Sequence, residues 1–254
     1  MRLLNHITTG KVIRLVQQSS QNTVVLEDEH FRWLTFDSII QSVMLKRAPN
    51  KLLIPHQQAL MIPLLFLTPK RIFELGLGGG NFSRSIKQLL PQAQLTTAEI
   101  NPVVVELFNE FFNPDAHSFD IKIMNGEQLI GDHGYQADWI VCDIYGSTKH
   151  SYLLKIKEAI AHPEHHATWS INLPDLPASD IDQLLKELKA IVVSSSPNGA
   201  PKYHISYLEI PQFKNVVIYL VPTPFKTLLK QQSALPGFLF NKLAASWQYR
   251  KTVL

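Results

Sequence analysis

The hydrophobic positions of the first seventy residues predict β-strands followed by one helix. Three short runs rich in aromatic and β-branched residues are separated by polar stretches, a pattern typical of hairpins or a meander. They cover residues 11–17, 22–27 and 31–36. Residues 43–50 are polar and basic and contain Pro49, so that we expect a connector there. Apolar residues at helical spacing then predict a helix over residues 55–67.

From residue 71 onward, short apolar runs alternate with stretches of helical periodicity. The apolar runs are 71–75, 95–100, 121–124, 137–144 and 167–173. The helical stretches are 83–90, 103–112, 151–161 and 179–192. Alternation of strands and helices over about a hundred residues predicts a doubly wound parallel sheet, which is a Rossmann-like α/β fold.

The last part of the chain predicts a hairpin and a helical tail. Two apolar runs, 203–210 and 216–221, are separated by a short loop, which favours an antiparallel hairpin at the sheet edge. The tail has two weakly amphipathic stretches, on either side of Pro236, and we expect helices packed on the domain. Three parts are therefore predicted. They are an N-terminal β-strand domain over 1–50, a Rossmann-like nucleoside-binding domain over 51–222 and a helical tail over 223–254.

Composition then excludes several classes of protein. A formal net charge of +3 is too small and too evenly spread to indicate nucleic-acid binding. The most apolar stretch, 59–67, is too short for a bilayer, and residues 1–11 lack the apolar segment of a signal peptide. A cytoplasmic protein without membrane contact is therefore expected. The single cysteine, Cys142, excludes an intrachain disulfide and a cysteine metal cluster. No histidine spacing indicates a metal site.

A glycine-rich loop follows the first predicted parallel strand and precedes a helix. Its glycines let the backbone turn sharply and let a ligand approach the main chain closely. They are Gly76, Gly78, Gly79 and Gly80. Glu99 ends the next strand, about twenty residues further on, where an acid accepts hydrogen bonds from ribose hydroxyls in doubly wound folds. Loop and acid together predict a nucleoside site, and a capping or solvated role for Glu99 is the alternative.

Two more polar positions follow strands at the same sheet edge. Asn125, followed by Gly126, can pair with the amino edge of adenine, although Asn-Gly is also a strong turn signal. Asp143 ends a buried apolar run, where a carboxylate is costly unless it is used or paired. It is placed to accept a proton or to orient an amine, and capping of the next helix is the alternative. Cys142 is expected to be an inert packing residue.

Together these motifs resemble those of the spermidine synthase (polyamine aminopropyltransferase) family, which shares the class I methyltransferase fold. The resemblance is carried by residues 73–80, 99–102, 125–126 and 143, and by Gln41 and His56 in the first part of the chain. It covers roughly residues 22–221. It implies a small N-terminal β-hairpin domain over a class I methyltransferase-type domain. The implied co-substrate is decarboxylated S-adenosylmethionine.

The resemblance also implies roles for single residues. Glu99 falls on the family's nucleoside-binding acid, Asn125 on its adenine-contacting Asp, and Asp143 on its catalytic Asp. Gln41 and His56 fall on donor or acceptor contacts, and Tyr145 falls on the acceptor side. Homodimers are common in this family.

Three departures from the family pattern concern cationic groups. Gly79 stands where the family has an Asp that holds the terminal amine of the donor. Residues 143–147, Asp-Ile-Tyr-Gly-Ser, lack the family's second Asp, which grips the polyamine. Pro55 stands in place of a tyrosine of the acceptor pocket. A buried ammonium group without a carboxylate partner is strongly disfavoured, so that these departures argue for a different or less charged acceptor.

The sequence therefore favours a divergent transferase that moves an aminopropyl group to a small amine without a metal. One alternative is a methyltransferase that uses intact S-adenosylmethionine, since loss of the acid at position 79 removes a clash with a donor carboxylate. The other is a non-catalytic nucleoside-binding relative. The acceptor, the choice of donor and the oligomeric state stay open at this point.

Overall fold

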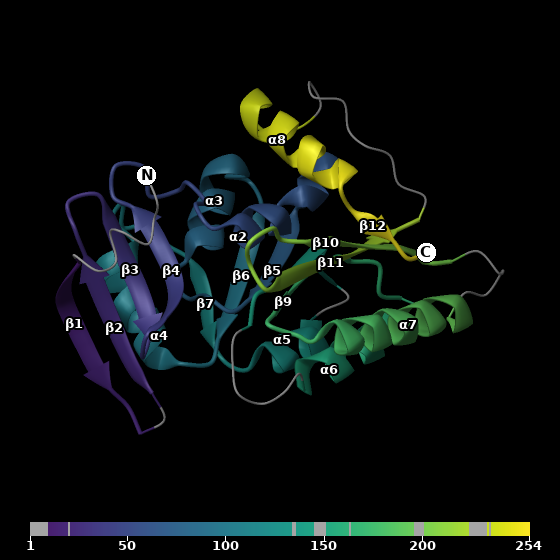
Figure 1. The fold of residues 1–254 in the computed structure, drawn as a ribbon, viewed down its shortest axis with the longest axis horizontal. Helices are drawn as coiled ribbons and strands as arrows, with labels where there is room; N and C mark the ends of the chain where they lie inside the picture. The colour runs from purple at the N-terminus through teal and green to yellow at the C-terminus, as the bar shows by residue number, and fades with distance from the viewer. Residues whose placement is uncertain are drawn as a thin grey trace.

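The computed structural model describes residues 10–19, 21–133, 136–144, 151–162, 164–195, 201–223, 233 and 235–254. These residues form a small sheet at one end of the molecule and a large sheet flanked by helices (Figure 1). The domain boundaries at residues 50 and 222 stay a prediction. No described helix is both long enough and apolar enough to cross a membrane.

The small sheet is antiparallel, with its strands in the order of the sequence. Its strands are β1 (Lys11–Gln17), β2 (Asn22–Glu27), β3 (Phe31–Phe36) and β4 (Ile39–Leu45). The first three confirm the predicted strands, whereas the connector predicted over 43–50 is wrong in its first part, because β4 extends to Leu45. Val43 packs with Trp33, and Met44 packs with Leu34 in a different cluster. Because Val43 and Met44 are buried, the strand continues through them and ends at Leu45, before the polar residues that follow.

The large sheet confirms the predicted doubly wound α/β fold. Its strand order is β12-β10-β11-β9-β8-β5-β6-β7. The parallel strands are β5 (Arg71–Leu75), β6 (Gln94–Glu99), β7 (Asp120–Ile123), β8 (Trp139–Cys142) and β9 (Thr168–Pro174). The antiparallel strands are β10 (Tyr203–Glu209), β11 (Asn215–Pro222) and β12 (Lys251–Thr252). Because β5 lies between β6 and β8, the winding reverses there, and ligands bind at the carboxyl ends of strands beside such a point.

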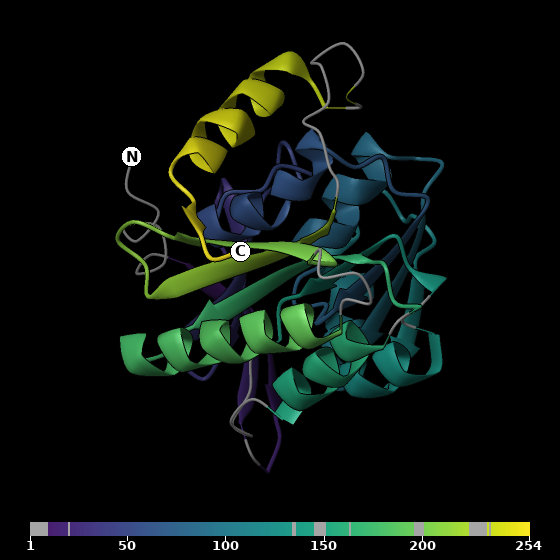
Figure 2. The same cartoon turned by 90° about the vertical axis from the view of Figure 1, so that its right-hand side faces the viewer.

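Helices cover both faces of the large sheet (Figures 1 and 2). One face carries α5 (Gly126–His133), α6 (Ser151–Ala161) and α7 (Ala178–Ser194). The other carries α2 (Pro55–Leu60), the 3-10 helix η1 (Ile62–Leu65), α3 (Asn81–Leu89) and α8 (Gly237–Gln248). Helix α4 (Pro102–Leu107) and the π-helical turn η2 (Phe108–Phe112) pack against the small sheet. The two sheets are thus joined through an apolar layer.

The structure differs from the predicted element order at three points. The helix predicted over 55–67 ends at Leu60 and continues as η1, which contains Pro63. Helix α5 is absent from the predicted elements, because Asn-Gly is a turn signal, whereas Gly126 begins the helix. The predicted antiparallel hairpin, β10 and β11, is confirmed, but β12 from the tail forms the outer edge. A two-residue strand carries too little hydrophobic pattern to be predicted.

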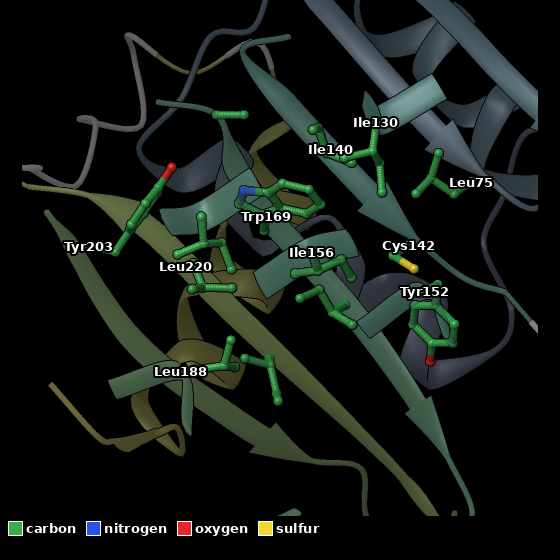
Figure 3. Close-up of a cluster of buried hydrophobic side chains, with 14 of the residues drawn as sticks. Leu75, Ile130, Ile140, Cys142, Tyr152, Ile156, Trp169, Leu188, Tyr203 and Leu220 are labelled. Carbon is green, nitrogen blue, oxygen red and sulfur yellow. The ribbon is translucent and has the colours of Figure 1, made fainter. Parts of the chain in front are cut away.

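The core under α5, α6 and α7 contains the single cysteine. Figure 3 shows the Cys142 sulfur beside the ring of Tyr152, in a cluster that also contains Trp169 and Tyr203. Burial raises the pKa of the Cys142 thiol well above its ordinary value. The thiol is therefore held in its protonated form, which is the poorly nucleophilic one.

A buried histidine just before the start of β9 should make the stability of the fold depend on pH. His165 is 3% exposed and stacks on Trp169 with ring centroids 5.2 Å apart. Neither ring nitrogen has a hydrogen-bond partner among the described residues. Burial, with a contribution from the charge of Lys202, lowers the pKa of His165 from 6.5 to about 4. The folded state therefore holds this ring neutral at a pH where the unfolded chain protonates it.

Because the folded pKa is the lower one, this contribution to stability is complete above the unfolded value and is lost as the pH falls from 6.5 towards 4. Between pH values of about 7.5 and 5, we expect a loss of roughly 2 kcal/mol in the free energy of unfolding. Urea denaturation of the wild type and of His165→Phe, which keeps an aromatic ring on Trp169, measures it. The variant should lose correspondingly less stability, and parallel pH curves would contradict the assignment.

Candidate functional site

A pocket of about 900 Å³ lies at the carboxyl edge of the large sheet, between the glycine loop and the small sheet. Most of the predicted site residues line it. They are Gln41, His56, Gly76, Gly78, Glu99, Asn125, Gly126 and Asp143. Gly79 and Gly80 are not among the lining residues, and Tyr145 lies outside the described residues. The fold thus brings together residues that are about a hundred positions apart in the chain, as expected for this sheet edge.

Within the glycine loop, the backbone of Gly76 lies very close to the backbone of Asp143, and both residues line the pocket. The φ of Gly76 is 94°, and a Cβ added there would lie 2.5 Å from the carbonyl oxygen of Asp143. Only glycine satisfies both conditions. Gly76 therefore allows the ends of β5 and β8 to meet under the pocket.

Gly79 turns away from the pocket and towards the small sheet. Its N–H donates to the Ser42 hydroxyl at 2.8 Å, and an added Cβ would lie 2.7 Å from Ser42 Cβ. Gly80 likewise faces the ring of Phe108. At these two positions the chain lacks a side chain because neighbouring side chains occupy the space. Their assignment as ligand-binding residues stays a prediction.

The Glu99 carboxylate connects the loop to the start of α4. One oxygen, Oε2, accepts from the Leu77 N–H at 3.0 Å, and Oε1 accepts from the Asn101 N–H at 2.9 Å. A carboxylate oxygen has two lone pairs, so each can accept a second hydrogen bond from a hydroxyl group. Glu99 thus meets the requirement for ribose binding at a position already fixed by the backbone.

The side chain of Asn125 takes part in a turn, which is the alternative role for this residue. Its Oδ1 accepts from the Glu127 N–H at 3.0 Å, at the first turn of α5. The amide NH2 group is the part that this turn does not use. A contact with adenine would therefore have to come from the nitrogen of Asn125, and it stays a prediction.

Asp143 lies in a polar network that joins four elements. Its Oδ1 accepts from Asn172 Nδ2 at 2.7 Å, and Asn172 Oδ1 accepts from Asn215 Nδ2 at 3.0 Å. The second oxygen, Oδ2, lies 4.0 Å from His56 Nε2. His56 Nδ1 is buried without a hydrogen-bond partner in the described part of the chain. The network fixes one oxygen of Asp143 and leaves the other on the side of His56.

Comparison with known proteins shows which proteins the chain resembles. No protein-family model matches the chain. A polyamine aminopropyltransferase of Neisseria meningitidis is 32% identical over 124 residues, which is 47% of each chain. The resemblance to the polyamine aminopropyltransferases is confirmed. The chain spans about half the length of the curated relatives it matches.

Solved structures extend the likeness to most of the chain at the level of the fold. A probable spermidine synthase from Corynebacterium glutamicum matches with a TM-score of 0.66 and 13% identity, over 94% of this chain and 89% of that one. Human methyltransferase-like protein 13 in complex with SAH matches with a TM-score of 0.51 and 20% identity, over 76% and 89%. Aminopropyltransferase-like and class I methyltransferase folds are therefore both related to this architecture.

Several residues in or beside this pocket could not be inferred from the sequence. Asn172 carries no signal beyond its polarity. Glu74 is buried beside the loop and accepts hydrogen bonds from the hydroxyls of Ser83 and Thr97. Burial raises the pKa of Glu74 to about 8, so that this carboxyl is mostly protonated at neutral pH. The one signal for Glu74 in the sequence is its position as an acid within an otherwise apolar run.

Proposed function

We propose that this chain is a transferase that binds the adenosyl part of a sulfonium donor and transfers an aminopropyl group to a small amine. The observation that carries the proposal is the position of Asp143 in the same pocket as the glycine loop and Glu99. Its carboxylate is fixed by Asn172 at 2.7 Å. The names of the curated relatives, polyamine aminopropyltransferases, support this reaction class.

In the proposed reaction the acceptor nitrogen attacks the donor carbon next to the sulfonium sulfur. The new C–N bond forms as the C–S bond breaks, and the electron pair of the broken bond stays on sulfur as a neutral thioether. The proton lost by the amine goes to Oδ2 of Asp143, the oxygen that Asn172 leaves unoccupied. Because the donor is already reactive, holding both reactants at the carboxyl edge supplies much of the acceleration.

A methyltransferase with intact S-adenosylmethionine is the second candidate, and one observation favours it. Position 79 is a glycine whose N–H donates to Ser42. The loop therefore offers no carboxylate at this position to the terminal amine of a decarboxylated donor. A class I methyltransferase structure with SAH also shares the fold. Calorimetry with decarboxylated and intact S-adenosylmethionine separates the two candidates. Tighter binding of the intact donor would replace aminopropyl transfer by methyl transfer.

Nucleoside binding itself is tested with 5′-methylthioadenosine and Glu99→Ala. Removal of the carboxylate should weaken binding by more than about tenfold, because two ribose hydroxyls lose a charged acceptor. Glu106→Ala is the matched control, since Glu106 is a 62% exposed acid that contacts Arg14 on the small sheet. An unchanged affinity in a folded Glu99→Ala protein would make this acid structural. If calorimetry detects no binding of 5′-methylthioadenosine, S-adenosylmethionine or decarboxylated S-adenosylmethionine, the proposed function is overturned.

A further inference from the structure

The pocket extends beyond the nucleoside side into a region with apolar walls. These walls come from the small sheet, the segment before α2 and the loop between β10 and β11. Their apolar lining residues are Phe36, Ile39, Ile40, Leu53, Ile54 and Phe213. Ile39 is 50% exposed and Phe213 is 46% exposed. Large apolar side chains that stay in contact with water at a pocket rim are stabilised when an apolar ligand covers them.

Negative charge is scarce in this region of the pocket. Among the described residues, four carboxylates line the pocket: Glu99, Glu127, Asp143 and Asp175. Glu99 binds the backbone of the glycine loop and α4, and Glu127 lies on α5 next to Gly126. Asp143 and Asp175 are then the two described lining acids outside the contacts of the glycine loop and α5.

Of these two acids, Asp175 already has a cationic partner. Lys214 Nζ lies 3.1 Å from Asp175 Oδ1, and both residues line the pocket at its mouth, where their side chains are 83% and 70% exposed. One carboxylate, Asp143, is thus left for an amine. A second ammonium group would meet apolar walls, which disfavour a charge, or the exposed Lys214, whose repulsion is modest because water screens it.

We infer that the acceptor is a monoamine with an apolar body, whose amino group lies at Asp143 and whose body covers Ile39 and Phe213. This acceptor class rests on the proposed function, because it assumes a sulfonium donor at the glycine loop. The reaction is the one described above, with the amine proton passing to Asp143. The rim pair Lys214–Asp175 acts as a selectivity element, since it neutralises the one acid that a second ammonium group could reach.

The test compares 1-aminopentane with 1,4-diaminobutane. The two molecules have the same number of heavy atoms, but the far end is a methyl group in the first and an ammonium group in the second. Their binding is measured by calorimetry or amide chemical shifts on the full chain saturated with 5′-methylthioadenosine. We expect 1-aminopentane to bind at least about tenfold more tightly. Equal or tighter binding of 1,4-diaminobutane, or binding of neither amine, would overturn the inference. If 5′-methylthioadenosine itself does not bind, the proposed function fails and the inference falls with it.

Two variants test the residues that carry the selectivity. Lys214→Ala frees Asp175 and should reduce the preference for 1-aminopentane several-fold by improving the binding of 1,4-diaminobutane. Lys251→Ala removes an equal charge from the outer edge of the large sheet, where the lysine binds Glu209 at 2.6 Å, and should leave the preference unchanged. Phe213→Ser should weaken 1-aminopentane alone. An unchanged preference in both Lys214→Ala and Phe213→Ser would overturn the assignment of the rim.

Discussion

Arg84→Met is expected to lower the free energy of unfolding by about 4 kcal/mol, the cost of leaving several buried hydrogen-bond acceptors without a donor. Arg84 is 2% exposed, and its guanidinium group donates to oxygen atoms of four segments. The partners are Pro49 O at 2.9 Å, Phe112 O at 2.7 Å, Asn81 Oδ1 at 2.6 Å and Gly79 O. Methionine fills the space but leaves these acceptors without a donor. Burial already lowers the pKa of Arg84 to about 10.

Urea denaturation of the wild type and the variant measures this loss. Lys87→Met is the matched control, because Lys87 is exposed on the same helix, and it should change stability by less than about 0.5 kcal/mol. Arg84→Lys should lie between the two, since an ammonium group reaches fewer of the four partners. A loss below about 1 kcal/mol in Arg84→Met would mean that water replaces the guanidinium group.

Asp143→Asn is expected to slow turnover by at least about a hundredfold while leaving nucleoside affinity nearly intact, because it removes the proton acceptor and keeps the shape of the side chain. The amide oxygen of asparagine can still accept from Asn172, so that the network is preserved. The readout is release of 5′-methylthioadenosine from decarboxylated S-adenosylmethionine in a single turnover with 1-aminopentane and 1,4-diaminobutane. A rate within about threefold of the wild type would assign Asp143 to a structural role.

The hydrophobic pattern was sufficient to predict the parallel strands and the loop, because apolar periodicity reports which face of an element is buried. It also placed Glu99 and Asp143 at one sheet edge, since parallel strands end on the same side. It did not predict α5, whose first residues carry a turn signal, or β4, whose last residues precede a basic stretch.

Polar partners could not be predicted because periodicity carries no information about which side chain lies opposite another. Ser42 and Gly79 are 37 positions apart, and Asp143 and Asn172 are 29 apart. Each pair meets only after two elements have packed. The same holds for Arg84, which on a helix surface would be read as a solvated charge. Its burial follows from the packing of α3 against the connector after β4 and the end of η2.

The hydrogen bond from Gly79 to Ser42 has a consequence for how separable the two sheets are. Asn81 also donates to Val43 O at 3.2 Å, and Arg84 donates to Pro49 O. The glycine loop and the start of α3 are therefore held in place partly by N-terminal residues, and the Rossmann-like unit is not an independent module. Free energy gained by ordering the loop around a ligand is shared with the packing of β4, so that binding and the cohesion of the small sheet are thermodynamically linked.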